Sequence, residues 1–308
     1  MKKRFSARYL FEQGSIRFKS RSSVVLAGAL AAAFPEFSQQ QLRNPVFFVG
    51  CGRSGTSLLQ HLLKAHRDIA VYPTEANELW FPQTYPWRSA KIDVPVFWDD
   101  PYGFTEISLK QSSPSYERHL QAVFGAYQFM TRGQAFLNKS VMVTFMIPRM
   151  LQLFPEARFI HIVRDGRAVV LSYAKWESKK IAANLARYQA GGYDFNLETL
   201  LEKFTKHWQD HLQEIARQNK ALQLEEKGRL FEIRYEDFCT DPGTHLRQLA
   251  VFIGVDPNRY GPLDLTQVKS QDYKFKSQLD EDSLRRITAL MQSTLNQRGY
   301  VALSDKLS

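Results

Sequence analysis

The sequence is poor in cysteine and has no hydrophobic run long enough to cross a membrane. Its 308 residues include two cysteines, Cys51 and Cys239, which form neither a metal-ligand cluster nor a disulfide framework. A reducing cytoplasm is therefore the simplest location. The apolar run from Val24 to Phe34 is too short to span a bilayer, and the charged segment before it is too long for a signal peptide. We expect a helix here that packs either on the domain or on a membrane surface.

The sequence also lacks a basic block, although it carries a net charge of +10. This excess of positive charge suits a polyanionic ligand or an acidic surface. Lys and Arg are spread along the chain without an aromatic-basic repeat, so only the net charge favours nucleic acid, and we expect no nucleic-acid partner. With 44% hydrophobic residues, the chain can bury a substantial core in one large domain or two smaller ones.

The stretch from Pro45 to Ser57 has the pattern of a phosphate-binding loop without its usual lysine. It reads PVFFVGCGRSGTS, which predicts a short strand, a glycine-rich turn and the start of a helix. Backbone N–H groups and a helix N-terminus would surround one point there. Gly50 to Ser57 matches the pattern G-x-x-x-x-G-K-[ST], except that Thr56 stands in place of the lysine and Arg53 brings a positive charge inside the turn. The alternative is a glycine-rich turn that binds no ligand.

A second motif is the segment RFIHIVRDGRAVVLSY, residues 158–173. Its apolar start predicts a strand that is buried on both faces, and Arg164 lies at the end of that strand. Ser172 follows two turns into the next helix, so the two side chains are suited to grip one phosphate. His161 lies inside the strand, and we expect it to be a core histidine rather than an acid or a base.

Both motifs resemble those of sulfotransferases that use 3′-phosphoadenosine 5′-phosphosulfate (PAPS). The segment GCGRSGTS is similar to the 5′-phosphosulfate loop, in the arginine form of the tyrosylprotein, carbohydrate and related bacterial branches. The spacing of Arg164 and Ser172 matches the 3′-phosphate motif, and Tyr235 lies in a segment that resembles the adenine side of the site. The resemblance extends over roughly Pro45 to Gly299. It implies a set of cofactor-binding residues: Gly52, Arg53, Ser54, Gly55, Thr56, Ser57, Arg164, Ser172 and Tyr235.

Catalytic candidates follow other predicted strands. Glu75 and Glu78 come after a short strand that ends near Tyr72, where loops surround the ligand crevice of a parallel sheet. The resemblance implies that one of them is the base that deprotonates the acceptor, and we favour Glu75, although either could be a solvated carboxylate. Lys139 lies at the end of another apolar run, and its spacing alone would indicate a surface charge. The resemblance instead implies that Lys139, together with Arg53, stabilises the leaving oxygen.

The segment from Phe81 to Pro114 is rich in proline and aromatic residues. Long segments of this composition commonly form lids or binding loops. We expect it to form the acceptor side of the site, with Trp87 or Trp98 offering a flat apolar face. The alternative is that these rings tack the loop to the core.

Strand and helix patterns alternate from Pro45 to Asp237, which predicts a single α/β domain with a P-loop-like, central, mostly parallel sheet flanked by helices. We place this domain at 45–308, after an N-terminal helical segment at 1–44. The expected function is transfer of a sulfuryl group from PAPS to an acceptor hydroxyl or amine, without a metal. The alternatives are a P-loop phosphotransferase and a non-catalytic nucleotide- or glycan-binding protein. The acceptor could be a glycan, a peptide tyrosine, a lipid or a small metabolite.

Overall fold

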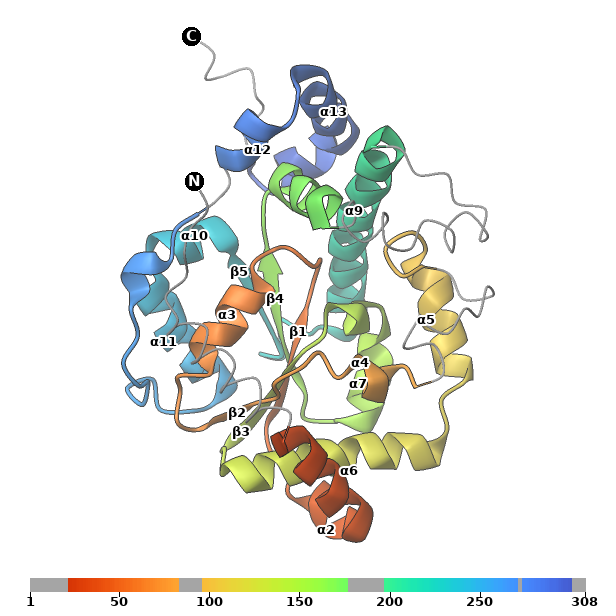
Figure 1. The fold of residues 1–308 in the computed structure, drawn as a ribbon, viewed down its shortest axis with the longest axis vertical. Coiled ribbons are helices and arrows are strands. Elements are labelled where there is room, and N and C mark those ends of the chain that lie inside the picture. The colour runs from red at the N-terminus through yellow and green to blue at the C-terminus, as the bar shows by residue number, and fades with distance from the viewer. Residues whose placement is uncertain (1–21, 83–95, 177–196, 271–272, 301–308) are drawn as a thin grey trace.

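A five-stranded parallel sheet forms the centre of the computed structural model, which describes residues 22–82, 96–176, 197–270 and 273–300 (Figure 1). The strands lie in the order β2-β3-β1-β4-β5, and each neighbouring pair is parallel. Their bounds are β1 Pro45–Val49, β2 Ile69–Val71, β3 Ala135–Lys139, β4 Arg158–Val163 and β5 Leu230–Arg234. The predicted α/β fold with a central parallel sheet is confirmed.

Helices cover both faces of this sheet (Figure 1). One face carries α3 Thr56–Leu63, α10 Tyr235–Thr240 and α11 Pro242–Ile253. The other side carries α4 Asn77–Trp80, α5 Pro101–Lys110, α6 Pro114–Thr131, α7 Ile147–Leu153 and α9 Leu197–Leu222. The remaining elements are helices over 22–33 and 166–176, α2 Pro35–Gln40, the short 3₁₀ helices η1 Val141–Met146 and η2 Leu265–Gln267, α12 Tyr273–Gln278 and α13 Glu281–Gln297.

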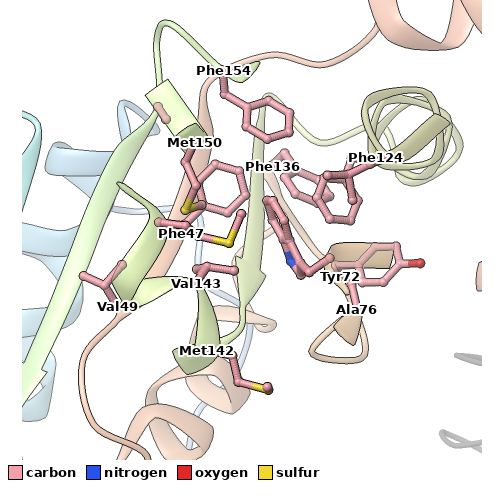
Figure 2. Close-up of a cluster of buried hydrophobic side chains, with 14 of the residues drawn as sticks. Phe47, Val49, Tyr72, Ala76, Phe124, Phe136, Met142, Val143, Met150 and Phe154 are labelled. Carbon is pink, nitrogen blue, oxygen red and sulfur yellow. The ribbon is translucent and has the colours of Figure 1, made fainter. Parts of the chain in front are cut away.

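The central strand β1 shows why these residues form a doubly covered sheet. Phe47 and Phe48 are adjacent and fully buried, but they point to opposite faces because side chains alternate along a strand. Phe47 packs with Phe136 and Phe154 beneath α6 and α7, and Figure 2 shows these rings together. Phe48 belongs to the other cluster, with Leu59 of α3. A run that is apolar at every position is therefore what this strand requires.

The expected N-terminal helix packs on the domain along one side only. In the helix over 22–33, Ala27 and Ala31 are buried in the core cluster that contains Phe47. Val25 and Leu26 on the same helix are 70% and 56% exposed. No helix among the described residues is long and apolar enough to cross a membrane.

The expectation that Trp98 offers an open face to an acceptor is wrong. Its side chain is 4% exposed and lies 5.2 Å from the ring of Phe204 in α9, measured between ring centroids. Trp98 therefore anchors the segment before α5 to the core. Trp87 lies outside the described residues.

Two glycines provide a matched test of how the N-terminal helices pack. A Cβ added at Gly125 in α6 would overlap the backbone carbonyl of Ser38 in α2, whereas a Cβ at Gly28 would meet nothing within 4 Å. We expect Gly125→Ala to lower the free energy of unfolding by about 1–3 kcal/mol, because backbone must shift. Gly28→Ala should raise it by about 0.5–1 kcal/mol, because alanine restricts the unfolded chain. Urea unfolding measures both, and equal stability of the two variants would contradict the observed packing of α2 on α6.

Candidate functional site

The candidate residues gather at one edge of the sheet because each follows the carboxyl end of a parallel strand. The glycine-rich loop over 50–55 follows β1, and Glu75 follows β2. Lys139 is the last residue of β3, Arg164 follows β4, and Tyr235 follows β5. Since β1 lies in the middle of the sheet, its loop is flanked by residues from the neighbouring strands.

The loop after β1 has the backbone conformation of an anion-binding turn. Arg53 and Gly55 both have positive φ angles, 67° and 102°, and such left-handed residues turn successive N–H groups toward one point. Gly55 is the N-cap of α3 and has no side chain to bond the first N–H groups of that helix. These donors and the positive end of the helix dipole therefore point at one position, where an anion is stabilised.

Close packing explains why two of the loop positions must be glycine. A Cβ at Gly52 would overlap the hydroxyl oxygen of Tyr173. A Cβ at Gly55 would come within 2.5 Å of the ring of Tyr235. Tyr173 lies in the helix over 166–176, and Tyr235 begins α10, so side chains from two other elements hold the loop in shape.

The two sequence motifs meet through hydrogen bonds. The Arg53 Nε donates to Ser172 Oγ at 3.1 Å, and an Arg164 guanidinium nitrogen donates to the backbone carbonyl of Arg53, also at 3.1 Å. The guanidinium of Arg164 lies 4.2 Å from the centroid of the Tyr235 ring. The structure therefore brings Arg53, Ser172 and Arg164 together, and their binding of phosphate groups stays a prediction. Tyr235 is only 4% exposed and contacts Arg164 and the loop; its packing against an adenine stays a prediction.

Glu75 and Lys139 form an ion pair across the ends of β2 and β3. Lys139 contacts one carboxylate oxygen of Glu75, and Asn77 Nδ2 donates to the other at 3.2 Å. Ser140 Oγ in turn donates to Asn77 Oδ1 at 2.9 Å. Lys139 is buried, whereas 38% of the Glu75 side chain is exposed. The carboxylate is thus held in one orientation with an open side.

Glu78, the reserve candidate, lies one turn further along. It is exposed in the first turn of α4, where its backbone carbonyl accepts a hydrogen bond from the Tyr116 hydroxyl at 2.7 Å. Lys139 forms its ion pair with Glu75 and not with Glu78. This contact favours Glu75 as the carboxylate that faces the strand ends.

The other predicted loop residues differ in exposure. Ser54 and Thr56 are buried, whereas Ser57 is exposed in the first turn of α3. The N–H of Gly50 donates to Thr144 Oγ1 at 2.8 Å, which ties the start of the loop to η1. Sequence reasoning missed Thr144, because it lies in a 3₁₀ helix with no motif of its own.

His161 is a core histidine, as expected. It is fully buried, and its Nδ1 lies 3.0 Å from a carboxylate oxygen of Glu232 on β5. Burial lowers the pKa of His161, while the pKa of Glu232 falls to about 2, because its hydrogen bond and charge interactions with His161 and Arg298 outweigh its own desolvation.

The similarity to known proteins extends over the part of the chain that contains these site residues. A family model described as "Sulfotransferase family" matches residues 45–259. The chain is similar to "Omega-hydroxy-beta-dihydromenaquinone-9 sulfotransferase Stf3" of Mycobacterium bovis and of Mycobacterium tuberculosis, each 26% identical over 256 residues. Each alignment covers 68% of this chain and 63% of the relative, so the chain spans less than two thirds of the length of these relatives. Among solved structures, sulfotransferase STF9 from Mycobacterium avium has a TM-score of 0.54 at 13% identity, covering 91% of this chain and 83% of that one. That similarity shows a shared fold.

A double-mutant cycle tests the packing of the loop. We expect Gly52→Ala to lower the free energy of unfolding by about 1–3 kcal/mol, because the new methyl group overlaps the Tyr173 hydroxyl. In a Tyr173→Phe background the hydroxyl is gone and the nearest ring carbon is 3.2 Å away. The cost of Gly52→Ala should then shrink by about 1 kcal/mol. Strictly additive effects in denaturant unfolding would mean that the two residues do not touch.

Proposed function

The chain belongs to the sulfotransferase family, and from this premise we propose that it transfers a sulfuryl group from PAPS to an acceptor hydroxyl or amine. The observation that carries the proposal is the hydrogen-bonded group of Arg53, Ser172 and Arg164. It joins the two phosphate motifs at the edge of the sheet where Lys139 and Glu75 also lie. Two guanidinium groups, an ammonium group and a helix N-terminus suit a nucleotide with several negative charges.

Each part of PAPS has a proposed partner in this arrangement. Backbone N–H groups from Gly52 to Thr56, with the hydroxyl of Thr56 or Ser57, would bind the 5′-phosphate. Arg164 and Ser172 would bind the 3′-phosphate. Burial of Thr56 leaves Ser57 as the more open of the two hydroxyls. Tyr235 would pack at the adenine side and also supports Arg164, whose guanidinium contacts its ring.

The reaction is an in-line displacement at sulfur. The acceptor oxygen forms a bond to sulfur and gives its proton to Glu75, while the bond from sulfur to the bridging phosphate oxygen breaks. The leaving group is adenosine 3′,5′-bisphosphate. Lys139 and Arg53 offset the negative charge that grows on the bridging oxygen. Because Lys139 and Asn77 hold both oxygens of Glu75, the base keeps its orientation while the acceptor approaches from its exposed side.

The residues of the loop argue against a P-loop phosphotransferase. Thr56 replaces the lysine that binds the β- and γ-phosphates in that class, and the positive charge is at Arg53 instead. A purely binding role would leave the pairing of Glu75 with Lys139 beside the loop without a use.

The proposal also covers the class of acceptor and the place of the enzyme in the cell. The curated relatives are named for an ω-hydroxylated menaquinone, so a terminal hydroxyl on a long apolar chain is the first acceptor class to test. The exposed Val25, Leu26 and Phe34 suit contact with a membrane surface from which such an acceptor could be drawn. We place the enzyme in the cytoplasm with reversible contact to that surface. Phenolic, glycan and small-metabolite hydroxyls form the other arms of the screen.

The function is tested by incubating the purified chain with PAPS and this acceptor panel. Formation of adenosine 3′,5′-bisphosphate and of a sulfated acceptor is followed by chromatography and mass spectrometry. We expect one acceptor class to give both products in equal amounts. Phosphorylated product from ATP and Mg²⁺, with no sulfated product from PAPS, would overturn the proposal.

Glutamine variants distinguish the two candidate bases. We expect Glu75→Gln to lower kcat by about two to four powers of ten, the usual contribution of a general base, with little change in binding of adenosine 3′,5′-bisphosphate. Glu78→Gln should keep turnover within a few-fold. The reverse result, loss of turnover only in Glu78→Gln, would assign the base to Glu78.

A further inference from the structure

A cluster of one thiol and two imidazoles lies directly behind the phosphate loop. Cys51, between Gly50 and Gly52, meets His207 and His211 of α9, and all three side chains are buried. The sulfur and one nitrogen from each ring lie within 4.8 Å of one another. The two histidines are four residues apart, so they occupy the same face of the helix.

Each of the two histidines has one ring nitrogen without a hydrogen bond of standard geometry. His211 Nδ1 lies 2.8 Å from the backbone carbonyl of His207, which only accepts, so Nδ1 carries the proton and Nε2 has a lone pair. His207 Nδ1 and His211 Nε2 make no hydrogen bond of standard geometry among the described residues, although the backbone of Val141 also lies close to the His211 ring. An unpaired buried polar atom costs about 1–3 kcal/mol, a cost that a bound ion would remove.

The surroundings suit a metal ligand set. A histidine that binds a metal commonly donates its other N–H to a backbone carbonyl, as His211 does. Imidazole binds a metal through an unprotonated ring nitrogen, and burial of both histidines disfavours their charged form. The hydroxyl of Tyr173 hydrogen-bonds to Cys51 and lies 3.4 Å from His207 Nε2, which puts an oxygen donor beside the cluster.

We propose that Cys51, His207 and His211 bind Zn²⁺ or a similar borderline-soft divalent ion behind the loop. One sulfur and two imidazole nitrogens are donors for such ions, whereas Ca²⁺ and Mg²⁺ require oxygen ligands. With bonds of about 2.0–2.3 Å, tetrahedral ligand atoms lie roughly 3.3–3.7 Å apart, so the cluster must contract by about 1 Å. The thiol releases its proton to solvent as the metal–sulfur bond forms.

The ion would act on the loop and not on the sulfuryl group. Cys51 directly precedes Gly52, whose N–H belongs to the proposed 5′-phosphate site. A bond from Cys51 through the metal to α9 would therefore fix the rear of that loop. The sequence analysis predicts no metal cluster because it considers the two cysteines alone, and the two histidines lie far from Cys51 in the sequence. The proposed ion supports the loop, whereas the earlier expectation concerns the transfer reaction, for which no metal is proposed.

Cobalt binding to the full-length chain tests the site without any measurement of activity. After treatment with a chelator and its removal, Co²⁺ serves as the probe because Zn²⁺ is spectroscopically silent. We expect one equivalent to produce a sulfur-to-cobalt charge-transfer band in the near ultraviolet and the visible bands of a tetrahedral ion. Added Zn²⁺ should displace the cobalt and abolish both. A folded parent chain without these bands would overturn the proposal.

Cysteine variants provide the matched control. Cys51→Ser should remove the charge-transfer band, whereas Cys239→Ser, a change at the other cysteine in α10, should keep it. His211→Asn should weaken cobalt binding at least tenfold, and it tests the site even if Cys51→Ser does not fold. Circular dichroism checks folding of each variant. A charge-transfer band that persists in folded Cys51→Ser, or unchanged affinity in folded His211→Asn, would overturn the assignment.

Discussion

Close packing around the loop after β1 is the constraint on which the rest of the site depends. Tyr173 and Tyr235 come from separate helices and leave no room for a side chain at Gly52 and Gly55. The backbone can therefore adopt a turn in which its N–H groups face the carboxyl edge of the sheet. The parallel order of the strands then delivers Lys139 and Arg164 from the two neighbours of β1. The backbone conformation of the loop therefore follows from this packing.

Contacts with neighbouring groups hold the positively charged side chains in place at the carboxyl edge of the sheet. Arg164 is supported by the Tyr235 ring and bonds the backbone of Arg53, and Arg53 reaches Ser172. Lys139 is compensated by Glu75, so its burial leaves no unpaired ammonium group. This pairing also keeps a carboxylate beside the cations, which is the combination that a sulfuryl transfer with a general base requires.

Much of the fold could be predicted because it depends on local patterns. The apolar run that starts at Pro45 is the strand β1, and the helix α3 follows the glycine-rich turn, in the order that the sequence predicts. The prediction for Trp98 was wrong, because the sequence does not show whether a tryptophan ring is exposed to a substrate or buried. In the structure this ring packs on Phe204. The cluster at Cys51 could not be predicted, since it depends on the distance between the loop and α9 in space.

The most direct test of the central claim is thermal unfolding of the purified chain with adenosine 3′,5′-bisphosphate, compared with ATP plus Mg²⁺, each against the chain alone. A chelator is present in the bisphosphate arm and in its reference, so these two samples differ only in the bisphosphate. At a concentration about 100 times its dissociation constant, a ligand adds roughly 2.7 kcal/mol to the free energy of unfolding. We expect the bisphosphate to give such a shift without a metal. Stabilisation by ATP and Mg²⁺ alone would contradict a PAPS site and favour a phosphotransferase.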